Sequence, residues 1–158
     1  MFMGKFEHAL DDKGRFAVPA KLRESIPEGE DRSTFSICRG NDGCLYMYTL
    51  RHWKAMDEAQ SQINAPVEKI RKRDRLRYAS AQKVTADSQG RILLPADLQT
   101  LAGITKEIVI VGVRDRIEVW DKKRWQNYES SETESYDQTD NEISNSAMNG
   151  SQPKPDKP

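Results

Sequence analysis

Two stretches of the chain carry an aspartate and an arginine four positions apart, with a glycine between them. They are "DDKGRFAVPAKL", which begins at Asp11, and "DSQGRILLPADL", which begins at Asp87. In each, a carboxylate and a guanidinium flank a short turn, where a charge-assisted pair would hold the turn's shape. The planar fork of arginine also suits contact with a phosphate or a guanine. The residues alone leave two interpretations open: purely architectural turns, or turns that present cations to a polyanion.

The two stretches belong to two copies of one sequence unit. A shift of 76 residues lays Gly14 on Gly90 and Pro19 on Pro95. Further along, a shift of 72 residues lays "CLYMYTLRHW" on "RIEVWDKKRW". Self-similarity at such a period is a strong architectural signal. We therefore divide the chain into a first unit over residues 5–64, a connector over 65–78, a second unit over 79–128 and a tail over 129–158.

The copies differ in charge at four matched positions. The first copy carries a basic residue at all four, whereas the second carries one arginine, one aspartate and two glutamines. The first copy is therefore expected to dominate contact with a polyanion, and Arg15→Ala is expected to weaken binding more than Arg91→Ala. The matched pairs are Lys13 and Gln89, Arg15 and Arg91, Lys21 and Asp97, and Arg23 and Gln99.

Short strands and short helices are predicted in each unit. "GRFAVP" and "GRILLP" have strand composition, and the flanking "FEHAL" and "KVTA" are expected to pair with them as local hairpins. Helices are expected over 19–26 and 95–102, each opened by proline, with Gly103 stopping the second. A second hairpin follows in each unit, and Thr49 and Asp121 are expected to cap the next helices. The predicted fold class is α+β and rich in β-strand.

The duplication has a physical rationale. A unit of roughly 45–60 residues has difficulty burying enough apolar surface to be stable alone. Two such units in one chain can pack on each other as an intrachain pseudo-dimer. The second copy is therefore expected to complete the fold.

The zero net charge of the chain hides an asymmetry. From Glu129 onward there are seven acidic and two basic residues, which leaves 23 basic and 18 acidic residues, a net of +5, in residues 1–128. The tail has almost no large apolar residues, so disorder is expected over 129–158. A solubilising extension is the simpler interpretation of this tail, and competition with a polyanion for a basic surface is the alternative.

The connector is predicted to be a basic helix opened by Pro66. Its run "EKIRKRDRLR" holds six basic residues with Glu68 and Asp74 among them. On a helix the six fall on several sides rather than on one stripe. A solvated helix is the usual meaning of such a run. Phosphate contact and salt bridges between subunits remain open as alternatives.

No pattern in the sequence indicates catalysis or metal binding. His8 and His52 lie in no metal-ligand spacing, and Cys38 and Cys44 lack a second Cys or His pair. No run approaches the roughly 18 apolar residues of a membrane span, and the start lacks the apolar region of a secretory signal. We expect a cytoplasmic protein that is not an enzyme, holds no metal or cofactor, contacts no membrane and keeps its cysteines as free thiols.

A family resemblance sharpens these expectations. "MFMGKFEHALDDKGRFAVPAKLRE" resembles the start of MraZ proteins, and both copies resemble the SpoVT-AbrB DNA-binding unit. The paired signatures, "CLYMYTLRHW" and "GITKEIVIVGVRDRIEVWDKKRW" all fit, so the likeness covers residues 1–128. It implies two interlocked, swapped-hairpin units. It also implies a nucleoid-associated transcriptional regulator that binds repeated boxes of double-stranded DNA, upstream of the division and cell-wall gene cluster, as a ring of several subunits.

The resemblance assigns roles to the signature residues. Arg23 matches a basic position used by AbrB-type units, whereas Gln99 in the second copy does not. A protein-interaction module of the antitoxin kind and a purely structural oligomerisation module are the alternative functions. The expected DNA-binding residues are Lys13, Arg15, Lys21, Arg23 and Arg91, and the expected turn-stabilising residues are Asp11, Gly14, Asp87 and Gly90.

Overall fold

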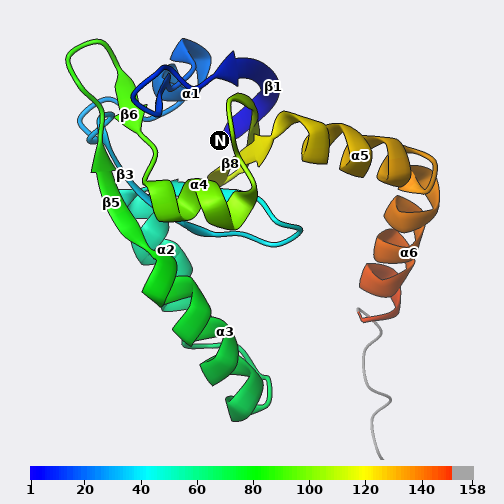
Figure 1. Cartoon of the computed structure of the whole chain (residues 1–158). Helices are drawn as coiled ribbons and strands as arrows, with labels where there is room; N and C mark the ends of the chain where they lie inside the picture. The colour runs from blue at the N-terminus through cyan, green and yellow to red at the C-terminus, as the bar shows by residue number, and fades with distance from the viewer. Residues whose placement is uncertain (151–158) are drawn as a thin grey trace, which may run out of the picture. The chain divides into compact units, whose positions relative to one another are not determined.

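The computed structural model describes residues 1–150 and confirms the α+β class (Figure 1). The chain forms two compact units, one over Met1–Arg124 and one from Trp125 onward. The strands are β1 (Phe2–Ala9), β2 (Arg15–Ala17), β3 (Thr34–Arg39), β4 (Leu45–Thr49), β5 (Gln82–Thr85), β6 (Arg91–Leu93), β7 (Glu107–Arg114) and β8 (Arg116–Asp121). The helices are α1 (Ala20–Glu24), α2 (Leu50–Gln60), α3 (Val67–Ser80), α4 (Ala96–Ala102), α5 (Lys122–Thr133) and α6 (Tyr136–Asn149).

Six strands form one antiparallel sheet in the order β1-β7-β8-β4-β3-β5, and β2 pairs with β6 in a separate two-stranded ribbon. Side chains alternate between the two faces of the sheet. One face is mainly aliphatic, with Ile37, Met47 and Ile110 fully buried. The ribbon contributes Phe16 and Ile92 to the same core cluster. The ribbon therefore packs on this face.

The opposite face of the sheet is aromatic and polar. Tyr48 on β4 meets Trp53 of α2 edge to face at 5.9 Å, and Trp53 in turn meets Tyr78 of α3 at 5.7 Å. On β8 the buried carboxylate of Glu118 accepts hydrogen bonds from Arg116 and from the indole of Trp120. The aromatic contacts attach α2 and, through it, α3 to the sheet.

Strand pairing differs from the predicted local hairpins. "FEHAL" lies in β1, which pairs with β7 of the second copy, and "KVTA" lies around β5, which pairs with β3 of the first. The prediction that each strand pairs with the three-residue strand that follows it is wrong. A three-residue strand offers few ladder hydrogen bonds to a local partner, and pairing between copies buries Phe16 and Ile92 instead.

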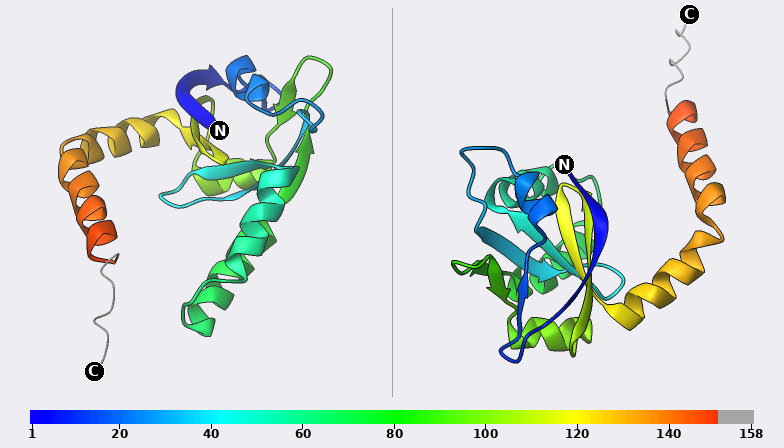
Figure 2. Two further views of the ribbon diagram at one scale, coloured as in Figure 1. Left: turned by 180° about the vertical axis from the view of Figure 1, so that it is seen from behind. Right: turned by 90° about the horizontal axis from the view of Figure 1, so that it is seen from above.

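Several predicted helix boundaries are confirmed. Pro66 precedes α3, and α4 ends at Gly103, whose φ of 64° is the left-handed conformation that glycine adopts readily. The Thr49 side chain accepts the His52 backbone N–H at 3.2 Å, which caps α2. In Figures 1 and 2, α2 and α3 project from the sheet as a helical arm, at the end of the first unit opposite α1 and β6.

The acidic segment after residue 128 is helical where the sequence analysis expected disorder. Helix α5 continues to Thr133, and α6 spans Tyr136–Asn149. No residue of either helix is buried, so tertiary burial does not explain them. The segment 122–149 contains no glycine or proline, and Gln138 donates to Glu142 one turn later at 2.9 Å. Residues 151–158 of the expected disordered tail lie outside the described residues.

Candidate nucleic-acid interface

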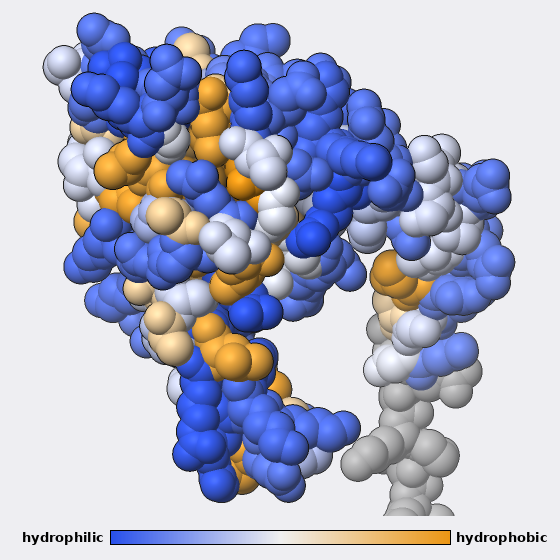
Figure 3. All heavy atoms as spheres, in the orientation of Figure 1, coloured by the Kyte–Doolittle hydropathy of each residue, from blue (hydrophilic) through white to orange (hydrophobic). Residues whose placement is uncertain are grey.

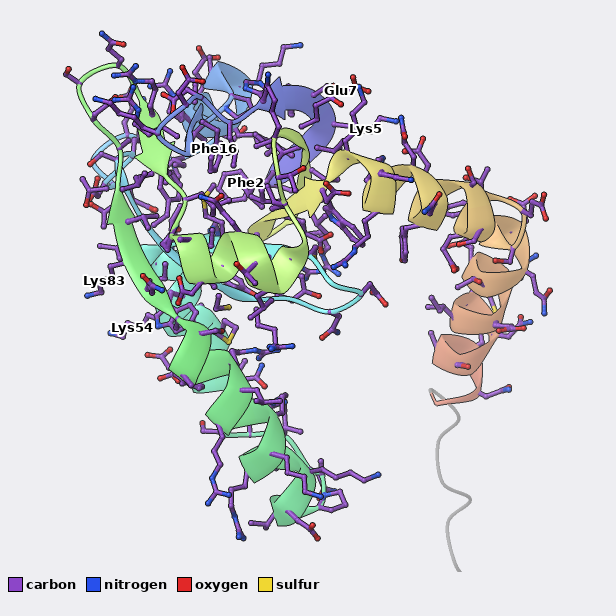
Figure 4. All side chains as sticks on the ribbon, in the orientation of Figure 1. Phe2, Lys5, Glu7, Phe16, Lys54 and Lys83 are labelled. Atoms are coloured by element: carbon purple, nitrogen blue, oxygen red, sulfur yellow. The ribbon has the colours of Figure 1, made fainter. Side chains whose placement is uncertain are left out.

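The β2–β6 ribbon brings the two signature arginines to one face. In the antiparallel register Arg15 lies opposite Leu93, and Ala17 lies opposite Arg91. Phe16, between them, points into the core, as Figure 4 shows. Since side chains alternate along a strand, Arg15 and Arg91 share the outward face of the ribbon. Residues 76 positions apart in the sequence therefore form one surface.

Each arginine ends a tight turn that its own aspartate closes. We call residues 11–15 the first corner. The Asp11 carboxylate accepts the backbone N–H groups of Lys13 at 3.0 Å and Arg15 at 2.8 Å, and its second oxygen accepts Arg15 Nε at 2.7 Å. Gly14 has a φ of 79° and donates its N–H to the Asp11 carbonyl at 2.9 Å. A side chain at this glycine would be strained, so the turn requires the residue found there.

The second corner, residues 87–91, repeats this geometry. The Asp87 carboxylate accepts the N–H groups of Gln89 and Arg91 and the Nε of Arg91, each at 2.9 Å. Gly90 has a φ of 75° and donates to the Asp87 carbonyl at 2.9 Å. Two corners of the same construction thus flank the ribbon.

Hydrogen bonding lowers the pKa of both corner aspartates. The backbone N–H of Arg15 is the main cause for Asp11, and that of Arg91 is the main cause for Asp87. Because these pKa values lie below the ordinary 3.8, the ionised carboxylates stabilise the folded protein above that pH. This stabilisation is lost as the pH falls through the lowered values.

An NMR titration of the aspartate carboxyl carbons tests this assignment. We expect Asp11 and Asp87 to titrate at lower pH in the folded protein than in the same chain unfolded in urea. Equal values in the two states would show that the corner hydrogen bonds do not form in solution.

The corner arginines remain accessible despite their ion pairs. The side chain of Arg15 is 27% exposed and that of Arg91 is 32% exposed. Each donates to its aspartate through Nε, which leaves the Nη amino groups for an outside acceptor. The corner thus aims a guanidinium that can still bind a phosphate or a base edge.

The two corners are joined through the backbone. The Gly14 carbonyl accepts the N–H of Leu94 at 2.9 Å, and the Gly90 carbonyl accepts the N–H of Val18 at 3.2 Å. Val18 and Leu94 occupy matched positions of the two copies. Each corner is therefore held by the strand that leaves the other corner.

Because each corner is bonded to the strand of the other copy, Arg23 and Gln99 each lie at the other copy's corner. A Cβ placed on Gly90 would lie 2.9 Å from Nη1 of Arg23, and one on Gly14 would lie 2.8 Å from Nε2 of Gln99. The amide of Gln99 also donates to the Leu94 carbonyl at 2.8 Å. Arg23 of the first copy therefore lies against the second corner, and Gln99 of the second copy lies against the first corner.

The structure therefore distributes the basic residues between the two corners differently from the alignment of the two copies. Lys13 and Arg15 lie on the first corner, and Arg23 lies against Gly90 of the second corner, which Arg91 ends. Lys21 is exposed on α1, while its matched residue Asp97 accepts hydrogen bonds from Gln82. Local sequence could not reveal this division, because it depends on pairing between residues some 76 positions apart.

The basic connector forms a second cationic surface. Four basic side chains of α3 are exposed, and one of them, Lys72, pairs with Glu68 at 3.0 Å. The end of the helical arm is largely hydrophilic in Figure 3. The exposed cations do not line one face of the helix, in keeping with a solvated helix. They are Lys69, Arg71, Lys72 and Arg75.

Residues 1–150 contain no cluster of three or more side chains suited to hold a metal ion, and no helix among them is long and apolar enough to span a membrane. Both cysteines are free and buried. Burial raises the pKa of Cys38 to about 11 and that of Cys44 as well, so both stay protonated near neutral pH. Neither thiol has the lowered pKa that a nucleophile needs.

Comparison with known proteins matches both halves of the chain to one family. The family model described as "MraZ protein, putative antitoxin-like" matches residues 1–77 and again residues 78–145. A protein named "Transcriptional regulator MraZ" from Pediococcus pentosaceus is 40% identical over 137 residues, covering 87% of this chain and 92% of the relative. Another with that name, from Natranaerobius thermophilus, is 36% identical over 143 residues, covering 90% and 96%. One from Lactobacillus delbrueckii subsp. bulgaricus is 41% identical over 138 residues, covering 87% and 93%. With both corners intact and a match along nearly its whole length, the chain belongs to the MraZ family.

Proposed function

We propose that this chain is a transcriptional regulator that binds double-stranded DNA through the outward face of the β2–β6 ribbon and its two corners. The observation that carries the proposal is the placement of Arg15 and Arg91 together on one exposed face, each braced by an aspartate. A rigid guanidinium loses little entropy on binding, which favours specific contact with phosphates and base edges. The relatives' name, transcriptional regulator, supports the same assignment.

The proposed target is a set of repeated short boxes in the promoter of the division and cell-wall gene cluster, bound by a ring of identical subunits. One ribbon offers five candidate cations, so its own affinity is weak and falls steeply with salt. Linking several ribbons in one ring makes later contacts intramolecular and raises avidity by about 10²–10⁴. The regulator then acts in the cytoplasm, associated with the nucleoid.

Affinity for duplexes with one, two and four boxes, measured at two salt concentrations, tests the multivalent assignment. We expect affinity to rise with each added box and the salt dependence to steepen. The boxes themselves are located by footprinting on the promoter region of the protein's own gene. Equal affinity for all three duplexes would contradict ring-based avidity. If the protein binds none of the duplexes at low salt, the proposal of DNA binding is wrong.

A protein-interaction function of the antitoxin kind is the second candidate. The family description includes the words "antitoxin-like", and α6 exposes three large apolar side chains. Exposed apolar residues on a helix are suited to a partner's groove. Pull-downs with the full chain and with residues 1–128 separate the two functions, because only a partner held by the acidic helices is lost on truncation. The exposed side chains are Tyr136, Ile143 and Met148.

A further inference from the structure

Arg23 is a cation whose side chain lacks an acceptor within the described part of the chain. Its Nε is buried and makes no hydrogen bond there, and its side chain enters no ion pair with residues 1–150. Its guanidinium lies against Gly90 of the second corner. A buried donor left unmatched is unfavourable, and the Nη groups of Arg23 have no acceptor among residues 1–150.

The other corner shows what a residue in this place does when it only supports the fold. Gln99, which matches Arg23, donates Nε2 to the Leu94 carbonyl and lies against Gly14. A neutral amide is therefore sufficient to hold a corner. Since Arg23 makes no such bond to the matched Val18 carbonyl, its charge is not needed for the turn.

We propose that Arg23 and Arg91, one from each copy, form a composite site for one DNA phosphate at the second corner, and that Gln99 deprives the first corner of an equivalent site. This inference rests on the proposed DNA-binding function. Arg91 offers its Nη groups on the outward face of the ribbon, and Arg23 supplies a second guanidinium beside Gly90. Two guanidiniums on one phosphate form charge-assisted hydrogen bonds that a single arginine cannot match.

The composite site makes the interface directional. At the first corner, phosphate contact depends on Arg15 and the flexible Lys13, whose ammonium acts as a point charge. At the second corner it depends on two arginines. A ribbon with unlike ends binds an asymmetric box in one orientation, which a symmetric pair of corners would not do.

Arg23→Gln is the decisive variant, because the protein already folds with glutamine at the matched position of the other copy. We expect this change to leave the melting temperature nearly unchanged and to lower affinity for a box-containing duplex about tenfold. The slope of log affinity against log salt concentration should become shallower by about one for each corner engaged. Lys54→Gln, an equal loss of charge on exposed α2 away from the ribbon (Figure 4), should change neither quantity appreciably.

The reverse change provides a gain-of-function test. Gln99→Arg should strengthen duplex binding and steepen the salt dependence, because it gives the first corner the missing guanidinium. In a double-mutant cycle, Arg23→Gln should be strongly non-additive with Arg91→Gln and additive with Arg15→Gln.

The outcomes separate this inference from the proposed function. If the wild type binds duplex but Arg23→Gln behaves like Lys54→Gln, the composite site is wrong while DNA binding stands. Additivity of Arg23→Gln with Arg91→Gln would also overturn the shared phosphate. If the wild type binds no duplex at low salt, both proposals fail together.

Discussion

Replacing Arg15 and Arg91 together with glutamine is expected to reduce affinity for box-containing DNA by about a hundredfold or more while leaving the protein folded. Each arginine supplies charge-assisted contacts worth about tenfold, and the two lie on one face of the ribbon. The fold should tolerate the change because both side chains are about one-third exposed, where an ion pair contributes little to stability. Titration of a labelled duplex, alongside thermal melting, measures both quantities.

The control for this variant removes the aspartate that closes the first corner and keeps the arginine. Asp11→Ala takes away the acceptor of two backbone N–H groups while leaving Arg15 in place. It should lower the melting temperature more than the double arginine variant does, since unmatched turn donors destabilise the corner. If the arginine variant instead melts early and binds normally when folded, the corners are architectural and the proposed interface is wrong.

The single variants Arg15→Ala and Arg91→Ala test whether the first copy contributes more to DNA binding than the second copy. The alignment of the two copies predicts a larger loss for Arg15→Ala than for Arg91→Ala, because the first copy carries a basic residue at all four matched positions. In the structure one of these four, Arg23, lies beside Gly90 instead. The basis for the predicted ranking is therefore weaker, and we expect the two single variants to lose affinity by similar factors.

The sequence is sufficient to predict features that depend only on residues close together in the chain. The tight corner follows from Asp, Gly and Arg at fixed spacing, and the end of α4 follows from Gly103. Both structures are closed by hydrogen bonds within a few residues. The α+β class likewise follows from alternating short apolar runs and proline-opened helices.

Features that depend on distant partners could not be derived in this way. β-strand composition does not specify a partner, so the sequence predicts that "FEHAL" pairs with the nearest strand, whereas its partner is β7. The place of Arg23 follows from the same pairing. The helices of the acidic segment differ from the prediction for another reason: low hydrophobicity predicts poor burial, yet a segment without glycine or proline forms helices without burial.

Gly112 is expected to be the most sensitive glycine for stability. It pairs with Gly4 across β1 and β7, where the two backbones approach closely. A Cβ on Gly112 would lie 2.8 Å from both the Met3 Cα and the Phe2 carbonyl carbon, and would also clash with the Met3 nitrogen. Because backbone atoms cannot rotate away, β1 must shift. We expect Gly112→Ala to destabilise the protein by about 3 kcal/mol, measured by denaturant unfolding.

The loss should extend to DNA binding, because β1 leads directly into the first corner. Leu10, next to that corner, donates its N–H to the Lys106 carbonyl at 2.8 Å, which continues the β1–β7 pairing to the edge of Asp11. Gly150→Ala provides the matched control: its added Cβ would meet only ordinary contacts at 3.6 and 3.8 Å, and its φ of −76° suits alanine. Equal stability of the two alanine variants would show that β1 does not lie on β7 in solution. A large destabilisation by Gly112→Ala with unchanged duplex affinity in the folded fraction would show that the first corner keeps its shape without the strand that precedes it.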